Sequence, residues 1–144
     1  HCKMAHLINY FFESTREFKR ALPKKDWIKS CLKNEKKGLD CINFIFCSDR
    51  YLQKINKKHL NKSYLTDVIT FDNKLNINDK DIIGDIFISI DRVRDNHYVY
   101  KTEFCDELAR IMIHGTLHLI GYSDKIKGDK KIMTEKENFY LKLK

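Results

Sequence analysis

The sequence predicts a single small α/β (α+β) domain in which several helices pack on a sheet of about four strands. Three observations favour this class. Short apolar runs of strand length alternate along the chain with longer segments that carry a helical stripe of apolar residues. The chain has 144 residues, of which 42% are hydrophobic, and this suits one core. No repeat or linker divides it, so residues 1–144 are expected to form one domain.

Four segments have the composition of strands. The runs LINYFF (7–12) and CINFIFC (41–47) are apolar and rich in aromatic side chains. The runs TDVITFD (66–72) and DIIGDIFISI (81–90) alternate between apolar and polar residues. A polar loop, NKLNINDK (73–80), separates the last two runs. This loop is longer than a tight turn, but we expect the two runs to pair as an antiparallel hairpin.

Helices are expected in the segments between and after these strands, at residues 23–37, 49–59, 91–100, 102–120 and 129–143. Pro23 suits the first turn of the first helix, and Gly38 suits a left-handed stop after it. Ser48 or Asp49 is expected to cap the second helix, and Thr102 to begin the fourth.

The fourth helix is apolar on most sides and is therefore expected to be the central buried helix. The last helix is amphipathic, and its apolar positions are expected to face the core. These positions are Ile132, Met133, Phe139, Tyr140 and Leu143.

Composition excludes several classes of protein. No stretch of 18 apolar residues occurs, so no membrane span or membrane partner is expected, and the first residues lack the pattern of a signal peptide. The five cysteines are odd in number and include no C-x-x-C pair. This usage favours idle thiols in a reducing cytoplasm over a disulfide framework. We therefore expect a cytoplasmic protein, and no nucleotide cofactor.

The net charge of +8 is unevenly distributed. Residues 1–72 carry 15 Lys and Arg against 8 Asp and Glu, whereas residues 73–144 carry 13 against 12. A basic surface favours a polyanionic partner such as RNA, because its cations neutralise phosphates and release counterions. The chain is also rich in Lys, Asn and Ile, and a biased nucleotide composition is an alternative explanation of the charge.

One motif carries chemistry, the segment IMIHGTLHLIGYSDK at residues 111–125. Residues four apart on a helix lie one turn above each other, so His114 and His118 can point at one metal ion. Gly121 permits the chain to turn back, and Asp124 is the nearest residue beyond it that can coordinate. Three protein ligands would leave a coordination position open for water, which is typical of a catalytic metal site.

Alternatives to a metal site remain open at this level. Two histidines at this spacing can be satisfied core residues, and Asp124 can be a loop residue that bonds its own backbone. A metalloprotease of the H-E-x-x-H type is disfavoured, because Gly115 follows the first histidine where that motif has glutamate.

The segment HGTLHLIGYSD resembles the H-G-x-L-H-L-x-G-Y-D-H signature of the YbeY family of rRNA-maturation endoribonucleases. The segments ELARIMIHG (107–115), LTDVITFD (65–72), GDIFIS (84–89) and DRVRDN (91–96) resemble further blocks of that family, in the family's order. MTEKE (133–137) resembles its closing helix. The resemblance spans residues 40–137 and is more specific than the histidine pair alone.

The resemblance implies a four-stranded mixed sheet with five to six helices and a metal site on the central C-terminal helix. It implies one divalent ion, with zinc favoured, held by His114, His118 and Asp124. The family's third histidine aligns with Asp124, and a carboxylate oxygen can also bind zinc. The catalytic group would be the metal-bound water.

A second departure concerns an arginine that the family carries near its active site, which aligns with Leu60. The cations that could replace it are Arg110, as a catalytic candidate, and Lys57, Lys58 and Lys62, as RNA-binding candidates. Arg110 lies four residues before His114, but it could instead form a surface ion pair with Glu107 or Asp106.

The resemblance implies an endoribonuclease that cleaves single-stranded RNA in 16S rRNA 3′-end maturation and ribosome quality control. Its partners would be rRNA and the ribosome or ribosomal proteins. The alternative is an rRNA- or ribosome-associated binding protein whose metal site is structural or vestigial, which the missing arginine favours.

Overall fold

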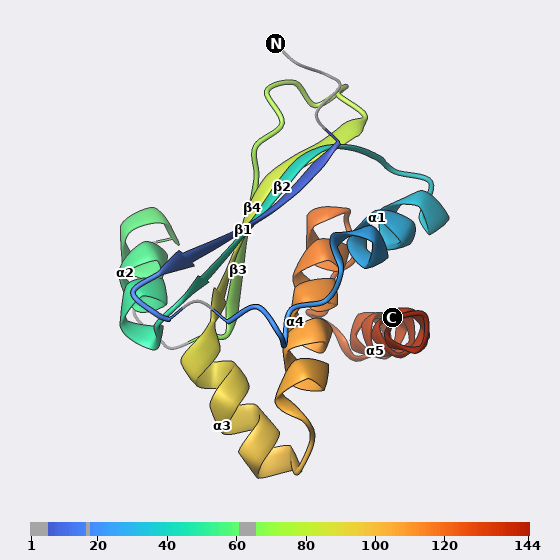
Figure 1. Cartoon of the computed structure of the whole chain (residues 1–144). Coiled ribbons are helices and arrows are strands. Elements are labelled where there is room, and N and C mark those ends of the chain that lie inside the picture. The colour runs from blue at the N-terminus through green and yellow to red at the C-terminus, as the bar shows by residue number, and fades with distance from the viewer. Residues whose placement is uncertain (1–5, 17, 61–65) are drawn as a thin grey trace.

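A four-stranded mixed sheet lies at the centre of the fold (Figure 1). The computed structural model describes residues 6–16, 18–60 and 66–144. The strands β1 (Leu7–Glu13), β2 (Gly38–Cys47), β3 (Val68–Asp72) and β4 (Asp81–Ser89) are arranged in the order β1-β2-β4-β3. β2 is parallel to β1 and to β4, whereas β3 runs antiparallel to β4. The predicted hairpin is therefore confirmed.

Five helices cover the sheet: α1 (Lys25–Asn34), α2 (Asp49–Leu60), α3 (Ile90–Tyr100), α4 (Phe104–Leu119) and α5 (Lys127–Lys142). α2 lies on one side of the sheet, and α1, α4 and α5 lie on the other (Figure 1). The predicted α+β class, with a four-stranded mixed sheet and five helices, is confirmed. No helix in the described part of the chain is long and apolar enough to cross a membrane.

Alternation along the strands explains the two layers of helices, because successive side chains point to opposite faces. Ile86 and Ile88 of β4 belong to the main core beneath α1, α4 and α5. Phe87, which lies between them, packs with Ile69 and Leu52 under α2. The even and odd positions of β4 therefore serve different helices.

Two glycines let α4 approach the sheet closely. A Cβ atom on Gly115 would lie 2.7 Å from a methyl carbon of Ile86, and one on Gly84 would lie 2.8 Å from a methyl carbon of Leu119 in α4. Real Cβ atoms do not come so near to other atoms. Gly115 lies between the two histidines of the motif, so the packing that it permits fixes the height of both imidazoles above the sheet.

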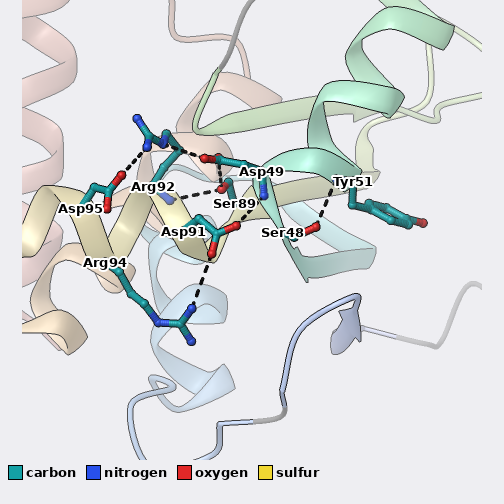
Figure 2. A network of polar contacts seen from close by, with 8 residues as sticks. All are labelled: Ser48, Asp49, Tyr51, Ser89, Asp91, Arg92, Arg94 and Asp95. Carbon is teal, nitrogen blue, oxygen red and sulfur yellow. Dashed lines mark hydrogen bonds and ion pairs between the residues drawn. The ribbon is translucent and has the colours of Figure 1, made fainter.

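A polar network joins the starts of α2 and α3 (Figure 2). The Ser48 hydroxyl accepts from the Tyr51 N–H at 3.1 Å, so the predicted Ser48 cap is confirmed. The buried Ser89 hydroxyl donates to Asp49 at 2.5 Å and accepts from the Arg92 N–H at 3.2 Å. Asp49 also binds the Arg92 guanidinium. Since β2 and β4 are adjacent parallel strands, the helices that follow them begin side by side and are tied together here.

Three local predictions at helix ends were wrong. α1 begins after Pro23, at Lys25, and Lys36 rather than Gly38 adopts the left-handed conformation, with φ 60°. Gly38 instead begins β2, where a Cβ atom would clash with the carboxylate of Asp81. Thr102 does not cap α4, because its hydroxyl donates to the Glu107 side chain and Glu103 holds the cap position.

The predicted inner face of α5 was only partly correct. Met133 and Tyr140 are buried, but Ile132, Phe139 and Leu143 are 47%, 49% and 58% exposed. The physical reason is that a narrow stripe of Met133, Glu137 and Tyr140 faces α4 and α1, at a spacing of four and three residues.

Candidate metal centre

His114, His118 and Asp124 come together at the C-terminal half of α4 and the turn that follows it. One ligand atom from each residue lies within 4.8 Å of the other two. The Nε2 atoms of His114 and His118 are each 3.3 Å from the same oxygen, Oδ2 of Asp124. Sequence reasoning chose these three residues as metal ligands, and the structure brings all three together.

The end of α4 explains why Asp124 can return to the histidines. Gly121 has a φ of +113°, a left-handed conformation that L side chains rarely adopt. The N–H groups of Gly121 and Tyr122 donate back to the carbonyls of His118 and Leu117 and end the helix. The chain then reverses direction, and Asp124 arrives above the last turn of α4.

Each imidazole is oriented by a hydrogen bond from its other nitrogen. Nδ1 of His114 lies 2.5 Å from the Glu137 carboxylate, and Nδ1 of His118 lies 3.0 Å from the Tyr122 carbonyl. Both partners are acceptors, so both Nδ1 atoms carry the proton and donate. The lone pairs of both Nε2 atoms are thereby directed at the space shared with Asp124, as in metal-binding histidines.

The donor set fits a divalent metal ion. Two imidazole nitrogens and one carboxylate oxygen are ligands that zinc and neighbouring ions accept. With three protein ligands, a fourth position would remain for water or substrate, as in catalytic zinc sites. His114, His118 and Asp124 would hold such an ion, and Glu137 and Tyr122 would keep the imidazoles in place.

Several carboxylates surround His114 at the centre. Burial alone would lower the pKa of His114, but its hydrogen bond to Glu137 and the charges of Glu137, Asp124 and Asp67 raise it. Burial raises the pKa of Asp67, and Asp124 adds to that increase while His114 opposes it. Because the carboxylates disfavour one another here, a divalent cation between them would be stabilised.

Arg110 is one turn before His114 on α4, but it does not pair with Glu107 or Asp106, so that expectation was wrong. Its guanidinium binds Glu137 at 2.9 Å and Asn138 at 2.8 Å. Since Glu137 also accepts from His114, Arg110 bears on the metal centre through this carboxylate. Its catalytic role stays a prediction.

The lysines that were predicted to bind RNA lie elsewhere. Lys57 and Lys58 are exposed in the last turn of α2, on the face of the sheet opposite to α4. The structure does not place them beside the metal ligands, and their contact with RNA stays a prediction. Lys62 and the side chain of Leu60 lie outside the described residues, so the predictions for them are not tested.

Sequence reasoning missed two side chains of the site, Glu137 and Asp67. Glu137 lies between Met133 and Tyr140 on the buried stripe of α5, with an 8% exposed side chain. A carboxylate on the buried stripe of an amphipathic helix was the available signal, because such a charge needs a partner. Asp67 lay within the quoted segment LTDVITFD, but nothing in its local spacing linked it to His114.

Comparisons with known proteins agree with the motifs. The model of the family described as Endoribonuclease YbeY matches residues 11–143. A Karelsulcia muelleri protein named Endoribonuclease YbeY is 48% identical over 135 residues, which is 94% of each chain. A Flavobacterium psychrophilum protein of the same name is 44% identical over 137 residues, or 95% of this chain and 96% of the relative.

A solved structure shares the fold. The solution structure of a Thermotoga maritima protein superposes with a TM-score of 0.67 at 25% identity, over 94% of this chain and 87% of that chain. The family model and the relatives confirm the resemblance found in the sequence, and the solved structure agrees with the fold. The chain belongs to the YbeY family of endoribonucleases.

Proposed function

We propose that this chain is a metal-dependent endoribonuclease that cleaves single-stranded RNA, acting in 16S rRNA 3′-end maturation and ribosome quality control in the cytoplasm. Membership of an endoribonuclease family supports the reaction class. The observation that supports the metal dependence is the convergence of His114, His118 and Asp124. The Nδ1 atoms of both histidines already donate hydrogen bonds, which leaves both Nε2 atoms for a metal. The rRNA site and the cellular role rest on the family resemblance.

The proposed cofactor is one divalent ion, with zinc favoured by the two imidazole ligands. When bound, such an ion lowers the pKa of water to about 7 and polarises phosphate oxygens. The chain contributes the orientation of the ligands. Glu137 holds His114, and Arg110 holds Glu137, so the guanidinium and the imidazole are fixed relative to each other.

RNA is the proposed substrate, and the ribosome is the proposed site of action. The excess of Lys and Arg in residues 1–72 supports binding to a polyanion. Lys57 and Lys58 are exposed at the end of α2 and available to phosphates. Their substitution is expected to weaken binding to all RNA sequences alike and to reduce its salt dependence.

Cleavage of an unstructured RNA oligonucleotide tests the reaction. We expect cleavage by protein loaded with zinc, none after chelation, and recovery when the ion is restored. The double variant His114→Ala/His118→Ala is expected to be inactive, whereas His6→Ala, a change at an exposed histidine outside the centre, is expected to retain activity. Cleavage by the double variant at the parent rate would reject the proposal.

Product termini separate two routes of cleavage. Attack by water leaves a 5′-phosphate and a 3′-hydroxyl, whereas attack by the ribose 2′-hydroxyl leaves a cyclic phosphate. Mass spectrometry of the products distinguishes them. Elemental analysis of the parent and of Asp124→Ala tests the third ligand, and we expect a lower metal content in the variant.

The alternative function is binding to rRNA or the ribosome without turnover. Leu60 at the position of the family's arginine is the observation that favours it. Co-sedimentation with ribosomes that is retained by the double histidine variant, together with no cleavage by the parent protein, would establish this alternative.

A further inference from the structure

A cavity of about 220 Å³ lies between α3 and α4, directly beside the metal centre. His114 forms part of its wall. Asp67, which directly precedes β3, and Asn96 and Tyr100 of α3 also line it. Sites for drug-sized ligands are larger, at about 300–1,000 Å³. The cavity therefore has room for one ring system and not for a whole nucleotide. A group bound there would lie next to whatever reacts at the metal centre.

The charges that line the cavity disfavour a phosphate. Asp67, Glu107 and Glu137 all contribute to its wall, and Arg110 is the cation among its lining residues. The Arg110 guanidinium is already bound by Glu137 and by Asn138. Like charges at short range repel, so an RNA strand would place a base here and keep its phosphates outside.

The apolar part of the wall suits a flat ring. Ile111 and Val93 contribute aliphatic surface, and Tyr100 lies at the end of α3 with 65% of its surface exposed. Tyr98 and Val99, which precede it, are 74% and 70% exposed. Nucleobases in single-stranded RNA bind by stacking on aromatic and apolar side chains. An exposed ring at the mouth of the cavity is what such stacking requires.

The polar part of the wall accepts hydrogen bonds. An ionised carboxylate only accepts, and Asp67 lines the cavity beside His114. Its two oxygens also accept from the backbone N–H groups of Asp67 and Val68, and four lone pairs leave capacity for further donors. Guanine presents two adjacent N–H groups on its Watson–Crick edge, which match the two oxygens of a carboxylate, whereas adenine and cytosine present a donor beside an acceptor. The carboxylate therefore discriminates among bases.

We propose that this cavity receives a nucleobase of the RNA next to the cleaved bond, that it prefers guanine, and that Asp67 determines this preference. The inference rests on the proposed endoribonuclease function and adds the base specificity of the same site. It assigns Asp67 to the reading of the base, and Tyr100 to stacking.

A set of single-stranded RNAs tests the preference. In each RNA one guanosine, adenosine, cytidine or uridine is placed in an otherwise uniform sequence, and the cleavage positions are mapped. We expect cleavage next to guanosine to exceed cleavage next to the other three by about 5- to 150-fold, the range for one bidentate base contact. Asp67→Asn presents an acceptor beside a donor, so its preference is expected to move from guanosine to adenosine and cytidine.

Two further variants keep the test specific. Tyr100→Ala is expected to weaken cleavage next to every base by about 5- to 150-fold, because stacking is insensitive to sequence. Asp79→Asn removes a charge in the exposed loop at the other end of the β3–β4 hairpin, and we expect it to leave the guanosine preference unchanged.

Binding provides a readout that does not need cleavage. Guanosine and adenosine monophosphates are titrated into the protein, and the NMR signals of Ile111 and Val93 are followed. We expect the guanosine nucleotide to bind more tightly to the parent protein, and the adenosine nucleotide to bind more tightly to Asp67→Asn.

The two proposals fail in different ways. If RNA is cleaved at equal rates next to all four bases and the two nucleotides bind equally, the base preference is overturned and the endoribonuclease proposal stands. If no RNA is cleaved but the guanosine nucleotide shifts the cavity signals selectively, the binding site is supported and the endoribonuclease proposal fails.

Discussion

Two glutamates with little-exposed side chains, Glu35 and Glu137, have different tasks. Each has a side chain that is 8% exposed. Residues of α5 bind Glu35, whereas Glu137 is itself part of α5. Glu35 accepts from the hydroxyls of Tyr122 and Tyr140 and from the Lys136 ammonium. Glu137 instead binds a guanidinium and an imidazole that points at the metal centre.

The comparison separates a structural cluster from a functional one on the same helix. The Glu35 cluster joins the end of α1, the turn after α4 and α5, and its partners keep their protons at neutral pH. It reaches His118 through the backbone of Tyr122, whose carbonyl lies beside Nδ1 of His118. Glu137 touches His114 directly. We infer that loss of Glu35 destabilises the fold, whereas loss of Glu137 lowers the affinity for the metal.

The largest effect is expected on removing Glu35. Glu35→Ala leaves two tyrosine hydroxyls and the Lys136 ammonium without their acceptor. A hydrogen bond to a charged group contributes about 1.5–3 kcal/mol, and two hydroxyls lose such a bond, whereas the Lys136 ammonium can reach water. Urea denaturation of the metal-free protein should show a loss of about 3 kcal/mol in the free energy of unfolding.

A matched variant tests whether position or charge matters. Glu135→Ala removes an exposed glutamate from the helix face next to Lys136, and its effect is expected to stay within about 0.5 kcal/mol. An equal loss of stability in both variants would show that the Glu35 cluster does not hold α1, α4 and α5 together.

The second largest effect concerns the metal. Glu137→Gln keeps the size of the side chain but removes the charge that orients His114 and raises its basicity. Changes in such outer partners of a ligand histidine typically reduce metal affinity by about 10- to 100-fold. Competition with a chelator of known affinity measures this loss.

Glu35→Gln is the comparison for that experiment. Its amide oxygen still accepts from the hydroxyls, so the Tyr122 carbonyl stays beside His118 and the metal affinity is expected to be that of the parent. A loss of affinity as large as that in Glu137→Gln would remove the distinction between the two clusters.

The sequence alone was sufficient to predict the three metal ligands, but not the glutamate that orients one of them. His114, His118 and Asp124 are close in the chain, so helix geometry and one glycine turn predict their meeting. Glu137 reaches His114 from another helix, 23 positions further along the chain. Such a contact depends on how α5 packs on α4, which no local spacing specifies.

The fold could be predicted to a similar extent, for similar reasons. Strand alternation and helical stripes are local, and they predicted the four strands and five helices of the described residues. Helix ends depended on longer-range contacts. Gly38 was expected to stop a helix, but it begins β2 beside Asp81, and Lys36 takes the left-handed conformation instead. The inner face of α5 was misjudged because Glu137 occupies a position that apolar residues usually take.

A smaller effect is expected from pH, and it tests the charge of Glu35. Burial raises the pKa of this carboxyl, but the bonds from Tyr122, Tyr140 and Lys136 outweigh burial and lower the pKa below 4.5. A lowered pKa in the folded state adds stability above the pKa of the unfolded chain. That stability is lost as the pH falls below about 4.5, by at most about 1.4 kcal/mol per pH unit.

Unfolding of the parent protein and of Glu35→Gln over acid pH measures this contribution. The advantage of the parent is expected to shrink over the acid range below about pH 4.5. A constant difference over that range would mean that the folded and unfolded carboxyls bind protons equally, and the proposed role of the tyrosine hydroxyls would be wrong.

The smallest effect is expected on removing the charge of Lys136. Its ammonium is 3.1 Å from Glu35 and 5.5 Å from the centre of the Tyr122 ring, but its side chain is 36% exposed. Solvent screens such a pair, so Lys136→Met should cost less than about 1 kcal/mol in urea denaturation. The two hydroxyls still satisfy Glu35 in that variant. If Lys136→Met instead costs as much as Glu35→Ala, the ion pair rather than the tyrosines holds the cluster, and Glu35 depends on a charged partner just as Glu137 does.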